Sequence, residues 1–414
     1  MTATQFTLIF IEILALTTVF KLWLARRHLA YVAKHRDAVP AAFSEQIQLT
    51  DHQKAADYTS AKTRFSMLGI QFDAALLLLL TAGGGIQFIS NLCQGWFTQP
   101  LTQGVVTLVA VLMLSSLLET PFNLYRTFRI EARFGFNNMT LKLYLLDTLK
   151  GLLVGAVLGL PLLFGVLWLM ARMGEYWWLY VWGAWVVFNL LILFIYPTFI
   201  APLFNKFSPL QDASMKARIE ALLARCGFAS SGLFIMDGSK RSAHGNAYFT
   251  GFGKTKRIVF FDTLLARLSG EEVEAVLAHE LGHFKHRHVV KRILATFALS
   301  LVFLWLLAML MKTDWFYQGL GVTTPSTALA LLLFFLVMPV FSFFIGPVMA
   351  AYSRKHEFEA DAYAAKQTSA GDLVSALVKM YQDNAATLTP DPMYSKFYDS
   401  HPPAAIRIAH LQTH

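Results

Sequence analysis

Seven apolar stretches, each long enough to cross a bilayer, constrain this chain more than any other feature of its sequence. A spanning helix needs about 17–25 mainly apolar residues to cross about 30 Å of hydrocarbon. Apolar residues make up 56% of the 414 residues and charged residues only 15%, whereas soluble domains carry about 45–50% and about 25%. The sequence therefore predicts an all-α polytopic membrane protein and excludes a single soluble globule. We place the seven spans near Phe6–Leu24, Met67–Ile89, Val105–Pro121, Leu152–Met170, Trp177–Tyr196, Ile293–Met311 and Ala328–Ala350.

Lysine and arginine are distributed unevenly among the loops, and this asymmetry predicts the orientation of the chain. The first loop, Ala25–Ser66, and the third, Phe122–Gly151, are basic, whereas the second, Ser90–Gly104, contains neither residue type. Basic loops stay in the cytoplasm, so we expect the N-terminus outside and the C-terminus inside. The formal net charge is +9. We assign it to topology and to contact with lipid headgroups, and we expect no nucleic-acid partner.

Two polar segments are long enough to fold outside the bilayer, and the charge rule puts both on the cytoplasmic side. We divide the chain into spans one to five (1–196), a first domain segment (197–292), spans six and seven (293–350) and a second domain segment (351–414). The second segment indicates helices broken by prolines. The first indicates a small α+β domain. Its expected elements are a helix over Met215–Cys226, strands over Leu233–Met236, Asn246–Phe252 and Ile258–Phe261, and a helix from Gly270.

Four polar side chains within the spans are functional candidates, because polar groups are costly in hydrocarbon. They are Glu12, Asp73, Glu119 and Asn189. They either form hydrogen bonds between helices or line a hydrated cavity, and the sequence leaves both interpretations open.

The strongest chemical signal is the sequence Ala278-His279-Glu280-Leu281-Gly282-His283, which contains His-Glu-x-x-His. Residues four apart share one face of a helix, so the two imidazoles can converge on one metal ion. Zinc suits neutral imidazole, and a catalytic site leaves one position open for water. Glu280 can then act on that water as a general base. The alternative interpretation is a helix with two ordinary core or surface histidines.

The third ligand must come from elsewhere in the chain. The metzincin spacing is not followed, because position 286 is His rather than Gly and position 289 is Val. Glu357 follows span seven and His283 precedes span six, so both are expected about 10–14 Å beyond the hydrocarbon on the same side. Asp361 lies four residues after Glu357 and can accept the second N–H of a zinc histidine; the alternative is a solvated charge. Glu359 points to another face of the helix, so we expect it to be an ordinary side chain without a role at the metal site.

With these motifs the chain resembles the M48 family of zinc metalloproteases, and within it the Ste24-type CAAX prenyl proteases. The resemblance covers most of the chain from about residue 120 onward. It rests on His279-Glu280-Leu281-Gly282-His283, Ser353-Arg354 with Glu357-Phe358-Glu359-Ala360-Asp361, Asn246-Ala247-Tyr248 before Gly251-Phe252, Phe134-Gly135-Phe136-Asn137, Ile200-Ala201-Pro202-Leu203-Phe204-Asn205-Lys206 and His401-Pro402-Pro403.

The resemblance implies a helical barrel around a chamber, with the zinc site facing inward under the cytoplasmic domain. It implies one zinc ion per chain, and it assigns the following roles. The zinc ligands are His279, His283 and Glu357, with Glu280 as base and Asp361 behind the ligands. Asn246-Ala247-Tyr248 resembles the strand that holds the substrate backbone. Asn246 and His401 are candidates for stabilising the oxyanion, although His401 also fits a helix cap before Pro402. Arg354 and Arg407 fit ion pairs near the site. By helical geometry, at 100° per residue, His286 and His288 lie off the metal face, so we expect them to be interfacial rather than ligands.

The strand over Asn246–Phe252 is supported by its residues as well. Tyr248, Phe249 and Phe252 favour β structure, and Gly245 and Gly253 bound the run. A protease must hold its peptide extended, and a sheet edge does this through main-chain hydrogen bonds. We therefore expect an edge strand beside the zinc, the alternative being a central strand that only packs the domain.

These features predict a membrane zinc endopeptidase whose partners are the lipid bilayer and a peptide or protein substrate. The family points to prenylated C-termini, and a membrane-protein quality-control protease is the alternative. A seven-span receptor or transporter with a structural zinc is a further alternative. The absence of a eukaryotic retention signal and the length of the chain favour a bacterial plasma membrane, with the endoplasmic reticulum membrane as the alternative.

Overall fold

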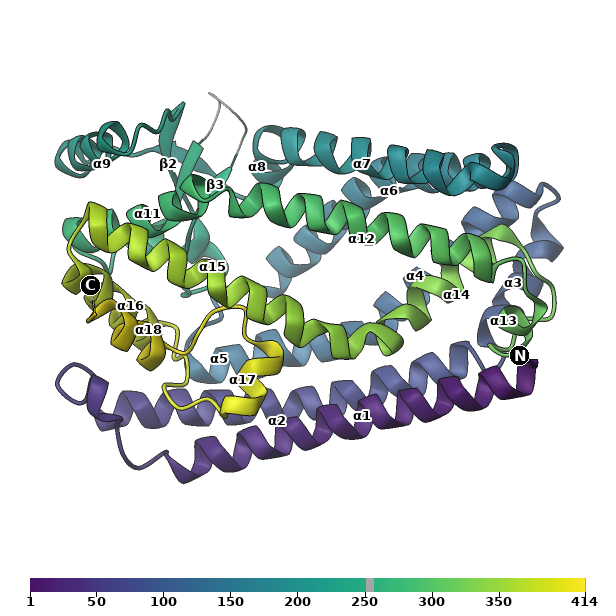
Figure 1. The fold of residues 1–414 in the computed structure, drawn as a ribbon, viewed down its shortest axis with the longest axis horizontal. Helices are drawn as coiled ribbons and strands as arrows, with labels where there is room; N and C mark the ends of the chain where they lie inside the picture. Colours follow the sequence, from purple (N-terminus) through teal and green to yellow (C-terminus); the bar gives the residue numbers. More distant parts are fainter. Residues whose placement is uncertain (251–256, 414) are drawn as a thin grey trace.

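The computed structural model describes residues 1–250 and 257–413. Within these residues seven helices are long and apolar enough to cross a membrane, one for each predicted span. They run along the long axis of the molecule, and the N- and C-termini lie toward its opposite ends (Figure 1). The helices that carry the spans are α1 (Ala3–Lys34), α2 (Leu49–Leu80), α4 (Pro100–Tyr125), α6 (Leu141–Arg172), α7 (Trp177–Ile195), α12 (His288–Leu310) and α14 (Thr327–Ser342).

Several of these helices are much longer than the hydrocarbon is thick. Helices α1, α2 and α6 have 32 residues each, which corresponds to about 48 Å at 1.5 Å per residue. A π-helical turn over Arg126–Glu131 and α5 (Ala132–Phe134) extend α4. A second π-helical turn, Tyr196–Ile200, and α8 (Ala201–Phe204) extend α7. The helices therefore project beyond the membrane as continuous rods.

One predicted boundary is wrong. The apolar run Met67–Ile89 was expected to be a single span, but α2 ends at Leu80 and α3 (Gly85–Trp96) begins a new helix. Gly84 has a φ of +76°, a left-handed conformation that glycine adopts without steric cost. The chain therefore turns at its three consecutive glycines although the apolar run continues through them.

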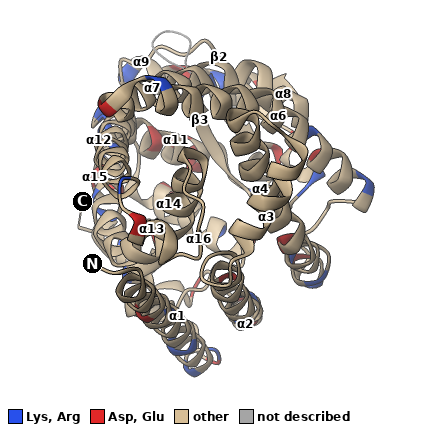
Figure 2. Ribbon diagram, turned by 90° about the vertical axis from the view of Figure 1, so that its right-hand side faces the viewer, with Lys and Arg blue, Asp and Glu red and all other residues tan. Residues whose placement is uncertain are grey.

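Helix α14 packs against four of the other membrane helices, α1, α4, α6 and α12. Half of its most apolar window is buried, whereas only 6% is buried in α6 and in α7. Viewed along the long axis, the helices form a ring (Figure 2). A hydrophobic core that includes Phe10, Ile86, Val111, Leu307 and Leu333 joins α1, α3, α4, α12 and α14, and α13 (Asp314–Gln318) packs against it. The remaining apolar faces of α6 and α7 are left for lipid.

The α+β domain lies at the end of the molecule opposite the N-terminus (Figure 1). Its four-stranded sheet has the order β1-β2-β4-β3, with β2 and β4 parallel and the other pairs antiparallel. The three expected strands are present as β2 (Gly232–Met236), β3 (Ala247–Thr250) and β4 (Arg257–Phe261), and β1 (Phe207–Pro209) was not predicted. Gly251, Phe252 and Gly253, which belong to the strand expectation, lie outside the described residues. The helices of this domain are α9 (Ala213–Arg225), α10 (Asp262–Leu265), α11 (Gly270–Lys285), α15 (Gly346–Gln367), α16 (Ala370–Asp383), α17 (Pro392–Tyr398) and α18 (Ala404–Leu411).

The domain is continuous with the membrane helices. Helix α12 begins at His288, three residues after α11 ends, and α15 follows α14 after a short 3-10 turn at Phe343–Ile345. The expected division points at residues 292 and 350 therefore fall inside α12 and α15. No loop separates the ligand-bearing helices from the two spans that follow and precede them.

Candidate metal centre and active site

Helix α11 carries the His-Glu-x-x-His motif, and its sequence explains where it begins. The Ser269 side chain accepts from the backbone N–H of Glu272, and the Glu272 side chain accepts from the backbone N–H of Ser269 at 2.7 Å, which is a capping box. Val273, Leu277 and Leu281 are buried in the core of the domain. This packing fixes the rotation of the helix and so the direction of its two histidines.

A close contact between α11 and α15 brings the third candidate ligand to the histidines. A Cβ atom on Gly282 would lie 2.8 Å from Cα and 3.0 Å from the carbonyl oxygen of Ala360. Only a glycine permits this approach. Glu357 and Asp361 lie one turn apart on α15 on either side of Ala360, so the contact places both carboxylates beside α11.

The donor atoms of His279, His283 and Glu357 converge as predicted. The two Nε2 atoms are 3.3 Å apart, and each lies 3.4–3.5 Å from a Glu357 carboxylate oxygen. Tetrahedral zinc with Zn–N bonds of about 2.0–2.1 Å separates its ligand atoms by about 3.3–3.4 Å. Within the described residues, the buried Glu357 Oε2 has no hydrogen-bond partner. The spacing and this orphaned oxygen both fit a bound zinc ion.

Asp361 lies behind His279, where the sequence placed it. Its Oδ1 is 2.8 Å from His279 Nδ1, and Arg407 donates to both of its oxygens at 2.9 and 2.6 Å. The Asp361 side chain is completely buried. Burial by itself would lower the pKa of His279, but the hydrogen bond to Asp361 and the nearby Glu357 carboxylate outweigh it and raise the pKa to about 9. Because Asp361 accepts the proton of Nδ1, Nε2 is the nitrogen that a metal ion would take in exchange for its proton.

His283 has a partner that sequence reasoning missed. Its Nδ1 lies 2.9 Å from His288 Nδ1, and His288 Nε2 lies 2.8 Å from Glu359 Oε2. His288 is buried and contacts Glu359, so the expectation of an ordinary Glu359 is wrong. Arg287 has a φ of +55°, so the chain turns between α11 and α12 and brings His288 back over His283. A histidine five residues on is off the ligand face of a continuous helix, which is why periodicity did not reveal it.

Glu280 lies between the two histidines in the sequence and is partly buried. Burial raises the pKa of its carboxyl group above the ordinary value, and the neighbouring His279 acts in the opposite direction. A carboxylate with a raised pKa is a better proton acceptor, as general-base catalysis requires.

His401 reaches the same cluster from the C-terminal segment. Its Nε2 lies 3.4 Å from Glu357 Oε1, although 62% of its side chain is exposed. The first helix after it, α18, is capped at Pro403 without a side-chain bond, so His401 is not a helix cap. Arg354 donates to the backbone carbonyls of Asp399 at 2.7 Å and Lys396 at 3.3 Å. Arg354 therefore holds the segment before His401 through carbonyls, whereas the sequence suggested an ion pair.

Strand β3 is an edge strand, as expected. The Phe261 N–H donates to the Asn246 carbonyl at 2.9 Å, and Ala247 is opposite Phe260 in the register. Hydrogen-bonded pairs alternate in an antiparallel ladder, so the N–H and C=O of Ala247 and Phe249 face the free edge. The Ala247 N–H donates to the side-chain oxygen of Asn246 at 2.8 Å.

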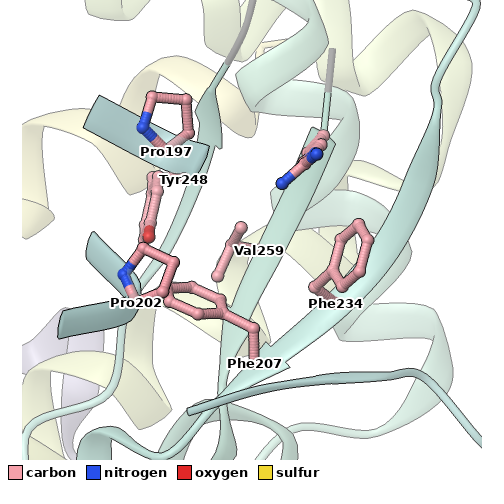
Figure 3. A pocket seen from close by; sticks show the side chains of 7 residues that line it. Pro197, Pro202, Phe207, Phe234, Tyr248 and Val259 are labelled. Atoms are coloured by element: carbon pink, nitrogen blue, oxygen red, sulfur yellow. The ribbon is translucent and has the colours of Figure 1, made fainter. Parts of the chain in front are cut away.

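The two faces of β3 have different surroundings. The Phe249 ring packs edge-on against Phe284, directly after His283 on α11, with 5.0 Å between centroids. The Tyr248 side chain points to the opposite face, into a small pocket lined by Pro197, Pro202, Phe207, Phe234, Arg257 and Val259 (Figure 3). The strand thus lies between the ligand helix and the extension of α7 that Tyr196–Ile200 and α8 form.

A membrane helix ring that carries a converging His-His-Glu set with an adjacent glutamate defines an integral-membrane zinc metalloprotease. Residues 28–206 match the family described as CAAX prenyl protease N-terminal, five membrane helices, and residues 209–414 match peptidase family M48. The chain therefore belongs to peptidase family M48, in its CAAX prenyl protease branch. This membership confirms the predicted family, fold class and enzyme class.

Individual relatives agree over nearly the whole length. A probable CAAX prenyl protease 1 from Schizosaccharomyces pombe is 33% identical over 396 residues, covering 92% of this chain and 83% of its own. The CAAX prenyl protease 1 homolog of Homo sapiens is 32% identical, covering 91% and 89%. The crystal structure of S. mikatae Ste24p is similar with a TM-score of 0.93 at 30% identity, covering 98% and 99%.

Proposed function

We propose that this protease holds one zinc ion with His279, His283 and Glu357 and hydrolyses peptide bonds beside strand β3. The observation that carries the proposal is the 3.3–3.5 Å spacing of the three donor groups. When bound, zinc supplies Lewis-acid polarisation of the scissile carbonyl and acidifies water. The family membership already argues against a receptor or transporter with a structural metal.

The chain's own residues supply the proton transfers. Glu280 accepts a proton from the attacking water and later donates it to the leaving amine. His401, whose imidazole lies beside Glu357 with an exposed side chain, donates to the developing oxyanion. Asn246 is the second candidate donor, since it is exposed at the start of β3. Asp361 and Arg407 keep His279 in one tautomer throughout.

The role of Glu280 is tested by Glu280→Gln in the purified full-length protein. We expect stoichiometric zinc to remain and peptide hydrolysis to fall by at least about 10²–10⁴-fold, the usual contribution of a general base. Glu220→Gln, at an exposed carboxylate of α9, is the matched control and should retain activity. Full activity in Glu280→Gln would show that another group is the base. Zinc retained by a His279→Ala/His283→Ala variant would show that the ligand set is wrong.

The similarity to CAAX prenyl proteases supports a prenylated C-terminus as the substrate. The alternative, membrane-protein quality control, predicts no need for prenylation. The two are separated by one peptide sequence assayed with and without a prenylated cysteine. We expect the prenylated peptide to be cleaved with a kcat/KM at least tenfold higher. Equal rates would favour the quality-control alternative and leave the protease assignment intact.

Strand β3 is proposed to hold the substrate backbone. Ala247→Pro removes an N–H that faces the free edge and not the ladder to β4, so the domain is expected to fold and bind zinc while cleavage falls sharply. Ala247→Ser keeps the N–H and should cleave normally. Unfolding or loss of zinc in the proline variant would make the strand structural, and normal cleavage would place the substrate elsewhere.

The chain is a multi-pass membrane protein, and we propose that the α+β domain faces the cytoplasm. The termini lie at opposite ends of the long axis (Figure 1), as an odd number of spans requires. The relatives described above are eukaryotic, so they give no support to the expected bacterial plasma membrane. They are consistent with the alternative, the endoplasmic reticulum membrane.

A further inference from the structure

A second group of metal-binding side chains lies on the far side of His283. Donor atoms of His286, His288 and Glu359 are all within 4.8 Å of one another, and the two imidazole rings stack with 5.5 Å between centroids and 14° between planes. We propose that these three residues form a second, weaker transition-metal site and that its occupation inhibits the protease.

The turn between two helices creates this arrangement. Helix α11 ends at Lys285 with His286 as its C-cap, Arg287 takes a left-handed conformation, and α12 begins at His288. The reversal lays two histidines side by side although only one residue separates them. Glu359 comes from α15, two residues after Glu357 and on a different face of that helix. His286 is exposed and the Glu359 side chain is 32% exposed, so an ion can enter from water.

The donor set determines the class of metal. Two imidazoles and one carboxylate suit zinc, copper or nickel rather than magnesium or calcium, which prefer oxygen ligands. The rings of His286 and His288 lie nearly parallel, so their in-plane lone pairs do not meet at one point and His286 must turn to complete the site. Lys355 approaches only the other oxygen of Glu359, at 3.9 Å, and its side chain is 73% exposed. These features make the second site weaker than the first but leave it accessible.

His288 cannot accept the hydrogen bond from His283 and bind a metal ion through Nε2 at the same time. With His283 Nε2 turned toward the first site, His283 Nδ1 carries a proton and donates to His288 Nδ1, while His288 Nε2–H donates to Glu359. A metal on His288 Nε2 takes the place of that proton, and the neutral ring then carries its one proton on Nδ1. Two N–H groups would face each other over 2.9 Å. The support for His283 is lost, and the first site is weakened.

Binding of the second ion stands on the His286, His288 and Glu359 geometry alone, whereas the inhibition rests on the proposed role of His283 as a zinc ligand. The test uses the full-length protein stripped of metal and titrated with zinc, with bound zinc counted by mass spectrometry and peptide hydrolysis measured in parallel. We expect two ions to bind, activity to rise with the first and to fall at least fivefold with the second.

The decisive variant is His286→Ala, which changes an exposed residue outside the proposed catalytic machinery. We expect it to bind one ion, to keep wild-type activity at one equivalent and to lose the inhibition. Lys285→Ala, at its exposed neighbour, should still bind two ions and be inhibited. A wild-type protein with a single ion and no inhibition overturns the inference, as does undiminished inhibition in His286→Ala. Failure of the proposed function looks different, since hydrolysis would then persist in the stripped protein or in Glu280→Gln.

Discussion

At the scale of single residues, the two candidate zinc histidines are supported in different ways. His279 contacts a carboxylate that is completely buried and held by Arg407. His283 contacts another histidine, which in turn contacts the partly exposed Glu359. The first arrangement is fixed by a buried ion pair and the second by a turn near the surface. We therefore expect substitutions behind His279 to be the more damaging.

The substitution Asp361→Asn tests this expectation. It removes the acceptor for His279 Nδ1–H and leaves Arg407 buried without its full counter-charge. The affinity for zinc should fall about 10–100-fold, and unfolding should become easier by about 3–5 kcal/mol, the usual cost of breaking a buried ion pair. Competition with a chelator and thermal unfolding in detergent measure the two effects. Unchanged zinc affinity would remove Asp361 from the site.

Glu272 gives a pH-dependent prediction at the start of the ligand helix. It accepts from Lys379 at 2.8 Å and from Ser375 at 2.6 Å. Burial opposes ionisation, but these partners more than compensate and lower the pKa of Glu272. A lowered folded-state pKa means that the carboxylate stabilises the fold at pH values above the ordinary value of about 4.3. This stability is lost as the pH falls through the lowered pKa.

The matching variant is Glu272→Gln. Near neutral pH it should unfold more easily than the wild type by about 1.5–3 kcal/mol, as for hydrogen bonds to charged groups. The difference should shrink as the pH is lowered from about 6 to about 3, and thermal unfolding across this range measures it. A difference that grows at low pH would contradict the assignment.

The residues of the first donor set were predictable because the motif, its helical spacing and the order of the spans all point to the same place. His288 was not, because its position depends on the left-handed turn at Arg287, and neither apolar periodicity nor a glycine marks that turn. Arg354 was placed near the site correctly, but its acceptors are backbone carbonyls, which carry no sequence signal.

At the scale of helices and strands, the contact between α11 and α15 is the critical one. Gly282→Ala would force a Cβ atom to within 2.8 Å of Ala360 Cα and push the helices apart. We expect a loss of about 1–3 kcal/mol in unfolding free energy, typical of overpacking, together with weaker zinc binding. Gly155→Ala in α6, where nothing lies within 4 Å of the added atom, is the control and should bind zinc normally. Normal zinc binding by Gly282→Ala would show that the contact tolerates separation.

Element positions were predictable where burial in lipid dictates them. All seven spans follow from their apolar runs, yet the helices continue for many polar residues past those runs, as α1 and α2 do. In water a helix is stabilised by packing rather than by a continuous apolar stretch, so its end is not visible in hydropathy. Strand β1 has only three residues and includes Pro209, which gives no β pattern. Its pairing with β2 depends on the tertiary structure.

At the scale of the whole molecule, the proposed orientation can be tested by labelling. Cys93 is buried and is a poor reporter, so we replace Cys93 and Cys226 with alanine. Trp96→Cys reports on the N-terminal end, where Trp96 is 84% exposed, and Lys240→Cys reports on the exposed surface of the α+β domain. A membrane-impermeant maleimide added to sealed membrane vesicles with their cytoplasmic face outward should label position 240, and position 96 only after detergent is added. The reverse pattern would invert the topology and move the active site to the other side.

The continuity of α12 and α15 with the α+β domain limits how the enzyme can be divided. Residues 197–292 alone contain two of the three proposed ligands, and Glu357 lies twelve positions into a helix that begins at Gly346. Joining 197–292 directly to 351–414 would remove the first turn of α15 and most of α12. The protease is therefore not modular. We therefore expect neither the α+β domain nor the membrane helices to work when expressed alone, and we expect truncated forms to be inactive.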